Sequence, residues 1–584
     1  MPVSFVRADS LLALDVGTVT TRASLFDVVD ARYRYLGSGE APSTVNAPYH
    51  DLSEGVHQAI QNLQQITGRN LIDAEAKLIV PSNSDGSGVD LVVATVSAGP
   101  PLKVILVGLL PDVSLESARH LLSTTVAQLL DQIHLGDHRN LQERLNLILK
   151  TQPDLVVVSG GTEGGAEKAV LQMLEAVGLA SLLSNEEARP QILYVGNSAI
   201  HPQVKSALGS FGTLILSANI RPTLEVEQLD GAKLDLMKAF RKVRGASMPG
   251  FYELDQLAGG GVIPPSFGWE RVVRMLSKAY DQRKGVMGVD LGASATIIAA
   301  GLGGNSTVGV FPQYGLANQH IHNLELVSTK DIAYWLTFEM SAQAIKDILL
   351  TKQTYPASLP MNKEELEVEH ALARLMLQYS LRDMRKRFNQ FGGGELPVLP
   401  PLEPIIAAGS VLTRAPRWSQ AAMVLLDGLQ PTRVTTLVLD QHHISALLGA
   451  VAAINPVLAV QAMDFGTLLN LASVIAPLGH ARPGTVVLKA KLIFEDGREE
   501  KMEFRYGNLY RIPLPFGQTL QLHLQPLHGF DLGMGGAGIG GKVRLSGSAL
   551  GAIIDVRGRP LPVIRDAKRR QDWIRRNLAV LETQ

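Results

Sequence analysis

Short apolar runs alternate with amphipathic stretches through the first half of the chain. Leu11–Leu14, Leu91–Val96 and Leu155–Val158 have the apolar character of buried strands, whereas Asp51–Ile66 and Leu115–Ile133 carry apolar residues at helical spacing. Strands that alternate with helices are typical of an α/β domain whose sheet is largely parallel at its centre. The pattern therefore predicts an α/β fold for this half.

Glycine, proline and a change of strand pattern indicate where the chain divides. Gly259–Gly261 and Pro264-Pro265 interrupt the first α/β pattern, and a new strand begins at Gly285. After residue 465, strand-like runs follow one another with hairpin signals such as Asp496-Gly497, and a basic amphipathic helix closes the chain. We therefore predict a first lobe at residues 1–265, a second lobe at 266–465, and a separate β-rich C-terminal domain with a terminal helix at 466–584.

One apolar stretch is long enough to raise the question of a membrane span. Ile444–Met463 is twenty residues without a charged side chain. Asn455-Pro456 interrupts it, and many of its residues are small. The favoured interpretation is a buried core helix that ends before Pro456, followed by a second apolar segment. We expect no stable membrane span.

Composition excludes several classes of protein. Hydrophobic residues make up 46% of the 584 residues and charged residues 19%, which is a globular balance. The net charge of −1 argues against a chain whose main role is to coat nucleic acid, so we expect no nucleic-acid partner. Cysteine is absent, which excludes a cysteine-bound iron–sulfur cluster. The apolar run Leu11–Leu14 is too short for a signal peptide, so we expect a cytoplasmic protein.

Two segments of the chain match each other. Leu11–Arg22 and Val286–Thr296 each form a strand-like run that ends in Asp, an aliphatic residue and Gly, followed by small or hydroxyl residues. One such segment is common at strand ends. Two of them, each opening a similar half of the chain, indicate an internal duplication.

The residues after each aspartate are suited to holding a polyphosphate. Gly17 and Gly292 would let the backbone approach a phosphate, and the N–H groups that follow would form a concave anion site. Thr18, Thr20 and Ser294 would add hydroxyl donors. These residue types predict a phosphate loop in each half.

The charged residues of the two segments would complete such a site. Asp15 and Asp290 would hold waters around Mg²⁺, a cation that prefers oxygen ligands and keeps several of its waters. Arg22 would either reach a phosphate or pair with a carboxylate. The alternative is that both aspartates merely cap turns at strand ends.

A second pair of apolar runs enters glycine turns. Leu155–Ser159 leads into Gly160–Gly165, and Pro404–Ala408 leads into Gly409-Ser410. Gly409-Ser410 would let the base or ribose of a nucleotide lie close to the backbone. The alternative is a tight strand-to-helix turn.

The paired pattern resembles the superfamily of actin, sugar-kinase and heat-shock-chaperone ATPases. In that superfamily two related lobes with a ribonuclease-H-like core clamp ATP, and each lobe contributes a phosphate loop. Asp15–Arg22 and Asp290–Thr296 resemble the two loops, and Ala407–Leu412 loosely resembles the adenosine loop. The resemblance implies a two-lobed actin-like α/β fold followed by the β-rich domain.

Within the superfamily, the chain is most similar to the family of the glutamate mutase accessory protein MutL. The similarity rests on Asp15–Arg22, Ser159–Gly165, Val195–Asn197 and Val289–Ile297, which occur in the family's order, and it extends over about residues 10–465. It implies a nucleotide-binding factor that reactivates or assembles an adenosylcobalamin-dependent mutase. It also implies ATP and water-bridged Mg²⁺ as cofactors, with Asp15 and Asp290 as catalytic and metal-associated residues. The implied nucleotide-binding residues are Gly17, Thr18, Thr20, Arg22, Gly292, Ser294, Gly409 and Ser410.

The second half departs from the family pattern. Ala293 stands in place of a glycine, Ile297 in place of an aspartate, Ala408 in place of the first adenosine-loop glycine, and Gln313–Ala317 in place of an acidic motif. These departures bear on hydrolysis more than on fold, and they leave open whether the chain is an enzyme or at most a weak ATPase. The alternative is a degenerate actin-like scaffold that binds partners with little or no hydrolysis. A small-molecule kinase ranks last, because no candidate carboxylate base stands out beyond the loop aspartates.

Overall fold

A computed structural model describes residues 9–211, 213–318, 326–388, 398–464 and 466–582. The chain forms two compact units. The N-terminal unit comprises Asp9–Leu25 and Gly37–Phe267, and the C-terminal unit comprises Phe26–Leu36 and the chain from Gly268 onwards. The division after Phe267 lies close to the predicted boundary at 265/266.

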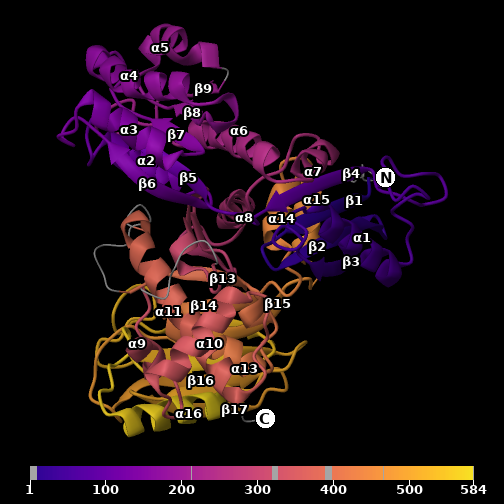
Figure 1. The fold of residues 1–584 in the computed structure, drawn as a ribbon. Helices are drawn as coiled ribbons and strands as arrows, with labels where there is room; N and C mark the ends of the chain where they lie inside the picture. The colour runs from indigo at the N-terminus through magenta and orange to yellow at the C-terminus, as the bar shows by residue number, and fades with distance from the viewer. Residues whose placement is uncertain (1–8, 212, 319–325, 389–397, 465, 583–584) are drawn as a thin grey trace. The chain divides into compact units, whose positions relative to one another are not determined.

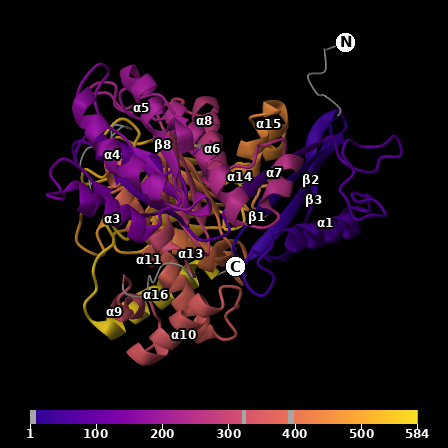
Figure 2. The same ribbon diagram turned by 45° about the horizontal axis from the view of Figure 1, so that its top comes forward.

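The first strands of the chain form a four-stranded sheet in the order β3-β2-β1-β4. β1 and β4 pair in parallel, with Asp15 opposite Thr95. Helix α1 packs on the sheet so closely that a Cβ at Gly39 of β3 would overlap the backbone of the helix at Ala59 and Leu63. Figure 2 shows α1 beside β2 and β3. The bounds are β1 Leu11–Val16, β2 Thr20–Val29, β3 Arg32–Pro42, α1 Ser53–Thr67 and β4 Leu91–Val96.

The N-terminal unit also contains a five-stranded sheet, β6-β5-β7-β8-β9, in which all neighbours are parallel. Ile105 and Val107 of β5 pack with α3, α4 and α5, whereas Val104 and Leu106 pack with α2 and α6 on the other face. Helices therefore cover both faces, as parallel sheets require (Figure 1). The bounds are β5 Leu102–Val107, α2 Ser114–Leu122, β6 Ala127–Ile133, α3 Leu141–Thr151, β7 Leu155–Val158, α4 Glu167–Leu183, β8 Gln191–Tyr194, α5 His201–Leu208, β9 Leu214–Leu216, α6 Asp230–Ser247 and α7 Phe251–Leu257.

The C-terminal unit contains an eight-stranded sheet in the order β12-β11-β10-β13-β14-β15-β21-β18. β10, β11 and β12 form an antiparallel meander, and β13 then pairs in parallel with β10. The order β12-β11-β10-β13 repeats the order β3-β2-β1-β4 of the first sheet, as expected for an internal duplication. The bounds are β10 Gly285–Leu291, β11 Thr296–Leu302, β12 Asn305–Phe311, β13 Leu402–Ala408, β14 Arg433–Leu439, β15 Leu469–Ala476, β18 Leu509–Ile512 and β21 Ala552–Asp555.

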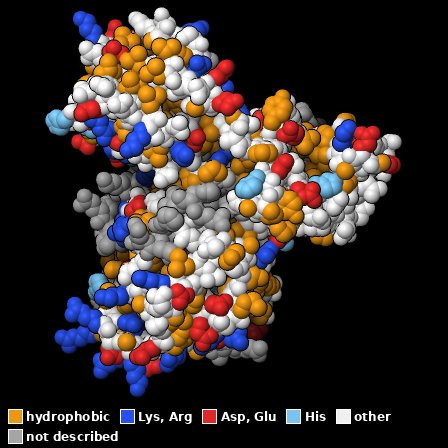
Figure 3. Space-filling view, in the orientation of Figure 1, with side chains coloured by type: hydrophobic (Ala, Val, Ile, Leu, Met, Phe, Trp, Pro, Cys, Tyr) orange, Lys and Arg blue, Asp and Glu red, His pale blue; other side chains and the backbone are white. Residues whose placement is uncertain are grey.

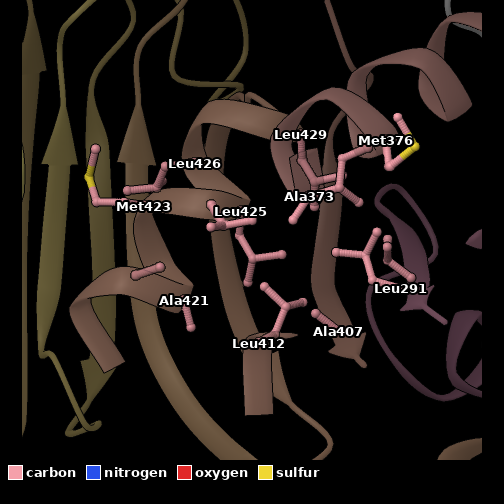
Figure 4. Packing of buried hydrophobic residues seen from close by; sticks show 14 of the residues in the cluster. Leu291, Ala373, Met376, Ala407, Leu412, Ala421, Met423, Leu425, Leu426 and Leu429 are labelled. Carbon is pink, nitrogen blue, oxygen red and sulfur yellow. The ribbon is translucent and has the colours of Figure 1, made fainter. Parts of the chain in front are cut away.

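Helices α11 and α13 pack against this sheet and close its main core. Met376 of α11 and Leu425 of α13 are fully enclosed, as are Leu291 of β10 and Ala407 of β13. Figure 4 shows how these apolar side chains interdigitate. The helices of this unit are α8 Pro265–Ala279, α9 Thr329–Tyr334, α10 Ala342–Thr354, α11 Lys363–Phe388, α12 Ser410–Thr413, α13 Trp418–Gly428, α14 Ser445–Val451, α15 Pro456–Asp464 and α16 Ala567–Glu582.

The chain after residue 465 contributes strands to two sheets. β15, β18 and β21 complete the eight-stranded sheet, and four further strands form a sheet in the order β17-β16-β19-β20. β21 is buried along its whole length and pairs in parallel with β15, which places it inside a shared core. The remaining bounds are β16 Val486–Phe494, β17 Glu499–Arg505, β19 Thr519–Pro526 and β20 Gly541–Ser546.

Helix α16 belongs to the same core. Its residues Trp573, Ile574 and Leu581 are buried in the cluster that surrounds α11. Its basic residues Lys568, Arg569, Arg575 and Arg576 are exposed. Figure 3 shows Lys and Arg side chains along the lower edge of this unit, where α16 lies. The helix therefore packs its apolar side on its own unit, which is the conventional role for an amphipathic helix.

A buried ionic network holds the C-terminal segment to α13. The Arg557 guanidinium donates two hydrogen bonds of 2.9 Å to the two Asp555 oxygens and one of 2.8 Å to Asp427. Arg374 of α11 donates to the other Asp427 oxygen at 3.0 Å. Burial alone would raise the pKa of Asp555, but Arg557 and Arg559 hold this pKa far below its usual range. The network joins β21, α13 and α11 through charged groups that water does not reach.

The apolar stretch Ile444–Met463 forms two helices, as expected. α14 ends at Val451, and α15 begins at Pro456. Within the described ranges, no helix has the length and apolar character needed to cross a membrane.

Candidate functional site

The first predicted phosphate loop is a tight hairpin turn between β1 and β2. The Gly17 N–H donates to the Thr20 carbonyl oxygen at 3.0 Å. A Cβ at Gly17 would come within 2.9 Å of that oxygen, so the turn requires glycine. The hydroxyl oxygen of Thr18 is enclosed, and no described residue forms a hydrogen bond with it. A buried polar atom without a partner is costly, so this hydroxyl is the loop's unsatisfied polar group.

The second predicted loop, between β10 and β11, repeats this geometry. The Gly292 N–H donates to the Ala295 carbonyl oxygen at 3.0 Å, and a Cβ at Gly292 would come within 2.8 Å of it. Asp290 lies opposite Ile297 in the antiparallel ladder. The matching hydrogen bond at equivalent positions makes the two loops structural counterparts.

Arg22 and Asp15 are held by neighbours within the first sheet. Arg22 is buried, donates through Nε to Glu40 at 2.9 Å, and lies 3.6 Å from Asp15. The Thr95 hydroxyl donates to Asp15 at 2.7 Å. Of the two roles weighed for Arg22, the structure therefore displays carboxylate pairing, and contact with a phosphate stays a prediction. The fixed Asp15 carboxylate is partly exposed, as a residue that orders metal-bound water must be.

The predicted adenosine loop lies against the second phosphate loop within the C-terminal unit. Gly409 has a φ of +113°, and a Cβ there would overlap the Leu291 carbonyl oxygen at the end of β10. Ser410 is exposed at the start of α12. The structure thus brings Gly409 and Ser410 next to the turn that carries Asp290 and Gly292.

Gln313–Ala317, which replaces an acidic motif, lies along the second loop. The Leu316 N–H donates to Gly292 at 3.1 Å and the Ala317 N–H to Ala293 at 2.9 Å. Asn318 then donates to the Ser294 carbonyl oxygen at 2.7 Å. The segment supports the loop through its backbone and brings no carboxylate to it.

Asn318 and Asp440 contribute to this region although sequence reasoning did not single them out. Asp440 follows β14, and its carboxylate accepts from the N–H groups of Ile444 at 3.0 Å and Ser445 at 2.7 Å. Burial raises the pKa of Asp440. Its geometry is that of a cap for α14. The signal in the sequence was an aspartate directly after an apolar strand, whereas nothing local marked Asn318.

Two segments of the sequence resemblance, Ser159–Gly165 and Val195–Asn197, meet the turn after β9 at the carboxyl end of the parallel sheet. Asn197, after β8, accepts from the Gly164 N–H at 3.1 Å and donates to the Gly165 carbonyl at 3.0 Å. Asn219, after β9, donates to the Gly161 carbonyl at 3.0 Å. Burial raises the pKa of Glu163, but hydrogen bonds from Ser198 and Asn219 outweigh burial and hold this pKa below its ordinary value. The glycine-rich turn after β7 is therefore fixed by two asparagines.

The residues of each loop, taken by itself, suit the phosphate or the magnesium-bound water of a nucleotide. Over the residues described, no group of three or more His, Asp or Glu is placed to hold a metal ion. Magnesium bound to a nucleotide needs only one or two carboxylates, because phosphate and water supply its other ligands. The unpartnered Thr18 hydroxyl and the close backbone turns at Gly17 and Gly292 suit phosphate oxygens.

Comparison with known proteins settles the family. A family model described as MutL protein matches residues 11–465, most of the chain. The chain belongs to the MutL protein family. Protein MutL of Clostridium tetanomorphum is 21% identical over 293 residues, which are 49% of this MutL-family chain and 57% of that protein. The chain thus spans little more than half the length of the curated relative it matches.

Several solved structures are similar at low identity. Nucleotide-free acetone carboxylase has 11% identity and a TM-score of 0.30, covering 86% of this chain and 82% of its own. The hexokinase of Thermus thermophilus has 11% identity and a TM-score of 0.25, covering 78% and 98%. Glycerol dehydratase reactivase has 10% identity and a TM-score of 0.28, covering 76% and 100%. These scores are low, so the fold class rests on the family and on the sheets themselves.

The family match and the repeated sheet order confirm the predicted fold class. The MutL-family chain has a mixed α/β fold of the two-lobed actin-like class, with an additional β-rich sheet in its C-terminal region. The site residues predicted from the sequence stay predictions.

Proposed function

We propose that this MutL-family protein binds Mg-ATP and acts as an accessory factor that reactivates or assembles an adenosylcobalamin-dependent mutase. The observation that carries the nucleotide-binding part is the repeated loop, in which Gly17 and Gly292 make the same hydrogen bond after Asp15 and Asp290. A glycine turn with free N–H groups and a hydroxyl is suited to phosphate, and a nearby aspartate to the waters of magnesium. Membership of the MutL family supports the accessory role.

Each predicted residue has a stated task in this proposal. Gly17 and Gly292 allow close backbone approach, while Thr18, Thr20 and Ser294 donate hydroxyl groups to phosphate oxygens. Asp15 and Asp290 orient magnesium-bound water, and Gly409 with Ser410 leaves space for the adenosine. When bound, the nucleotide supplies a charge that differs before and after hydrolysis. A difference in affinity between those two states biases which conformation the protein presents to its partner.

The unpartnered Thr18 hydroxyl allows a sharp test of nucleotide binding. Thr18→Val keeps the side-chain shape and removes the donor, and Thr125→Val is a matched control because the Thr125 hydroxyl is also enclosed without a partner. A hydrogen bond to a charged group contributes about 1.5–3 kcal/mol. We expect Thr18→Val to weaken ATP binding by about tenfold or more and Thr125→Val to leave it unchanged, as measured by calorimetry. Equal affinities for both variants would exclude this loop as the phosphate site.

The accessory role needs a separate assay with a purified mutase. The mutase is inactivated by turnover, and its activity is measured after this protein is added with Mg-ATP, with Mg-ADP, or without nucleotide. The proposal expects recovery that depends on ATP. Neither association nor recovered activity under any of the three conditions would refute the accessory role while leaving nucleotide binding intact.

A non-hydrolysing scaffold is the second candidate, and a specific observation favours it. Ile297 is buried opposite Asp290, and Gln313–Ala317 donates backbone hydrogen bonds to the second loop. Ile297 is apolar and Gln313–Ala317 contains no acidic residue, so neither supplies a carboxylate that would order a water for attack on the terminal phosphate. ATP binding with no phosphate release, in the presence and absence of a partner, would select the scaffold.

A further inference from the structure

The sheet β17-β16-β19-β20 carries a row of basic residues across all its strands. Lys501 of β17 lies opposite Lys491 of β16, Lys491 lies opposite His523 of β19, and His523 lies opposite Lys542 of β20. We name these four residues the basic row. Adjacent strands are about 4.8 Å apart, so the row spans about 14 Å. Arg544 lies one step along β20, on the same face.

The basic row lies on the outer face of this sheet. The alternate residues of each strand, such as Leu492, Phe504, Leu522 and Leu545, are buried in one apolar cluster with β15 and β21. Lys501, Lys542 and Arg544 are exposed. The sheet is therefore covered on one side by its own unit, and the row is displayed on the other.

Basic residues that face one another on neighbouring strands lower the stability of the folded sheet, and the fold does not require this arrangement. Like charges directly opposite each other on neighbouring strands destabilise a sheet. Lys491 is relieved by Glu499 at 2.8 Å, and the neighbouring Lys489 by Glu503 at 2.9 Å. Among the described residues, no carboxylate pairs with Lys501 or Lys542, and the Nε2 atom of His523 is enclosed without a hydrogen-bond partner. An unfavourable arrangement of like charges that no other residue of the chain compensates is typical of a binding surface.

We propose that the basic row docks an acidic surface of a protein partner. The other outward residues of β19 include Gln521 and Gln525, whose amides can donate hydrogen bonds to carboxylates and backbone carbonyl groups. Apart from the half-buried imidazole of His523, the outward residues of the two central strands include no aromatic ring on which single-stranded nucleic acid could stack. These four strands also carry no exposed large apolar side chain that could enter a lipid surface. Charge complementarity would fix the orientation and speed the encounter.

The test uses the full-length protein and fluorescently labelled poly-glutamate as the acidic polypeptide probe. The row variant is Lys491→Gln/Lys501→Gln/Lys542→Gln. The matched control, Lys568→Gln/Arg569→Gln/Arg576→Gln, removes the same formal charge from exposed positions of α16. Anisotropy titrations are run at two salt concentrations, in parallel with a thymidine oligonucleotide and with phosphatidylserine vesicles.

The proposal expects the row variant to weaken poly-glutamate binding by about tenfold or more and the α16 variant by less than about twofold. It also expects the thermal midpoint of the row variant to rise, because repulsion is removed. Equal losses in both variants, or no binding by the wild type, would overturn it. If the wild type bound the oligonucleotide or the vesicles more tightly than poly-glutamate, and the row variant lost that binding, the proposal would be overturned in favour of nucleic acid or lipid. A lower thermal midpoint would show that the row serves the fold. None of these outcomes depends on ATP binding.

Discussion

Replacing Arg557 by methionine tests the energetic role of the buried ionic network. Arg557 is fully buried, and Asp555 and Asp427 are each 1% exposed. The substitution removes three hydrogen bonds of 2.8–2.9 Å and leaves Asp427 with only Arg374, and Asp555 with only Arg559, as charged partners. Removing one partner of a buried ion pair typically costs about 3–5 kcal/mol, because the remaining charge is not solvated.

The chain offers a selective signal for this experiment. All four of its Trp residues lie in the C-terminal unit, so tryptophan fluorescence during urea unfolding reports on that unit. We expect Arg557→Met to lower the free energy of unfolding of this unit by about 3–5 kcal/mol. The control is Arg283→Met, which removes an exposed ion pair with Asp281 and should leave the midpoint unchanged. Coincident midpoints for Arg557→Met and the wild type would refute the assigned role of the network.

Two further predictions concern other buried polar groups. Burial and Arg374 lower the pKa of His370 from 6.5 to about 3, so the unfolded chain binds a proton that the folded chain excludes, and stability should fall as pH falls from 6.5 towards 3. His370→Leu should remove that part of the pH dependence in fluorescence-monitored unfolding, and an unchanged slope would contradict the assignment. Asn197→Ala removes both hydrogen bonds to the turn at Gly164 and Gly165, and should cost the N-terminal unit about 1–3 kcal/mol in urea unfolding followed by circular dichroism. Retention of full stability would show that the turn is held without Asn197.

Local patterns in the sequence predicted the parts of the fold that depend on local physics. The repeated Asp-x-Gly segments indicated the duplication, because the tight turns at Gly17 and Gly292 need a glycine. Asp496-Gly497 indicated the β16–β17 hairpin, where Gly497 has a φ of +81°. The interrupted apolar stretch at Asn455-Pro456 indicated two short helices instead of one long one.

The parts that the sequence did not predict depend on pairing between distant residues. The sequence predicted strand-like runs after residue 465, but no local pattern states that β15, β18 and β21 extend the sheet of the second lobe. Arg22 had two open roles because its partner Glu40 lies on another strand. The basic row could not be predicted from the sequence, because its four residues lie on four different strands and are aligned only by the pairing register of those strands.

Isothermal titration calorimetry of Mg-ATP binding to the full-length protein tests the central claim most directly. The account predicts saturable binding to the wild type, and loss of that binding in Asp15→Ala and in Asp290→Ala. Circular dichroism of each variant would establish that its fold is retained. No detectable binding of millimolar nucleotide to the wild type, or full binding by both folded variants, would contradict the claim that these loops bind nucleotide phosphate.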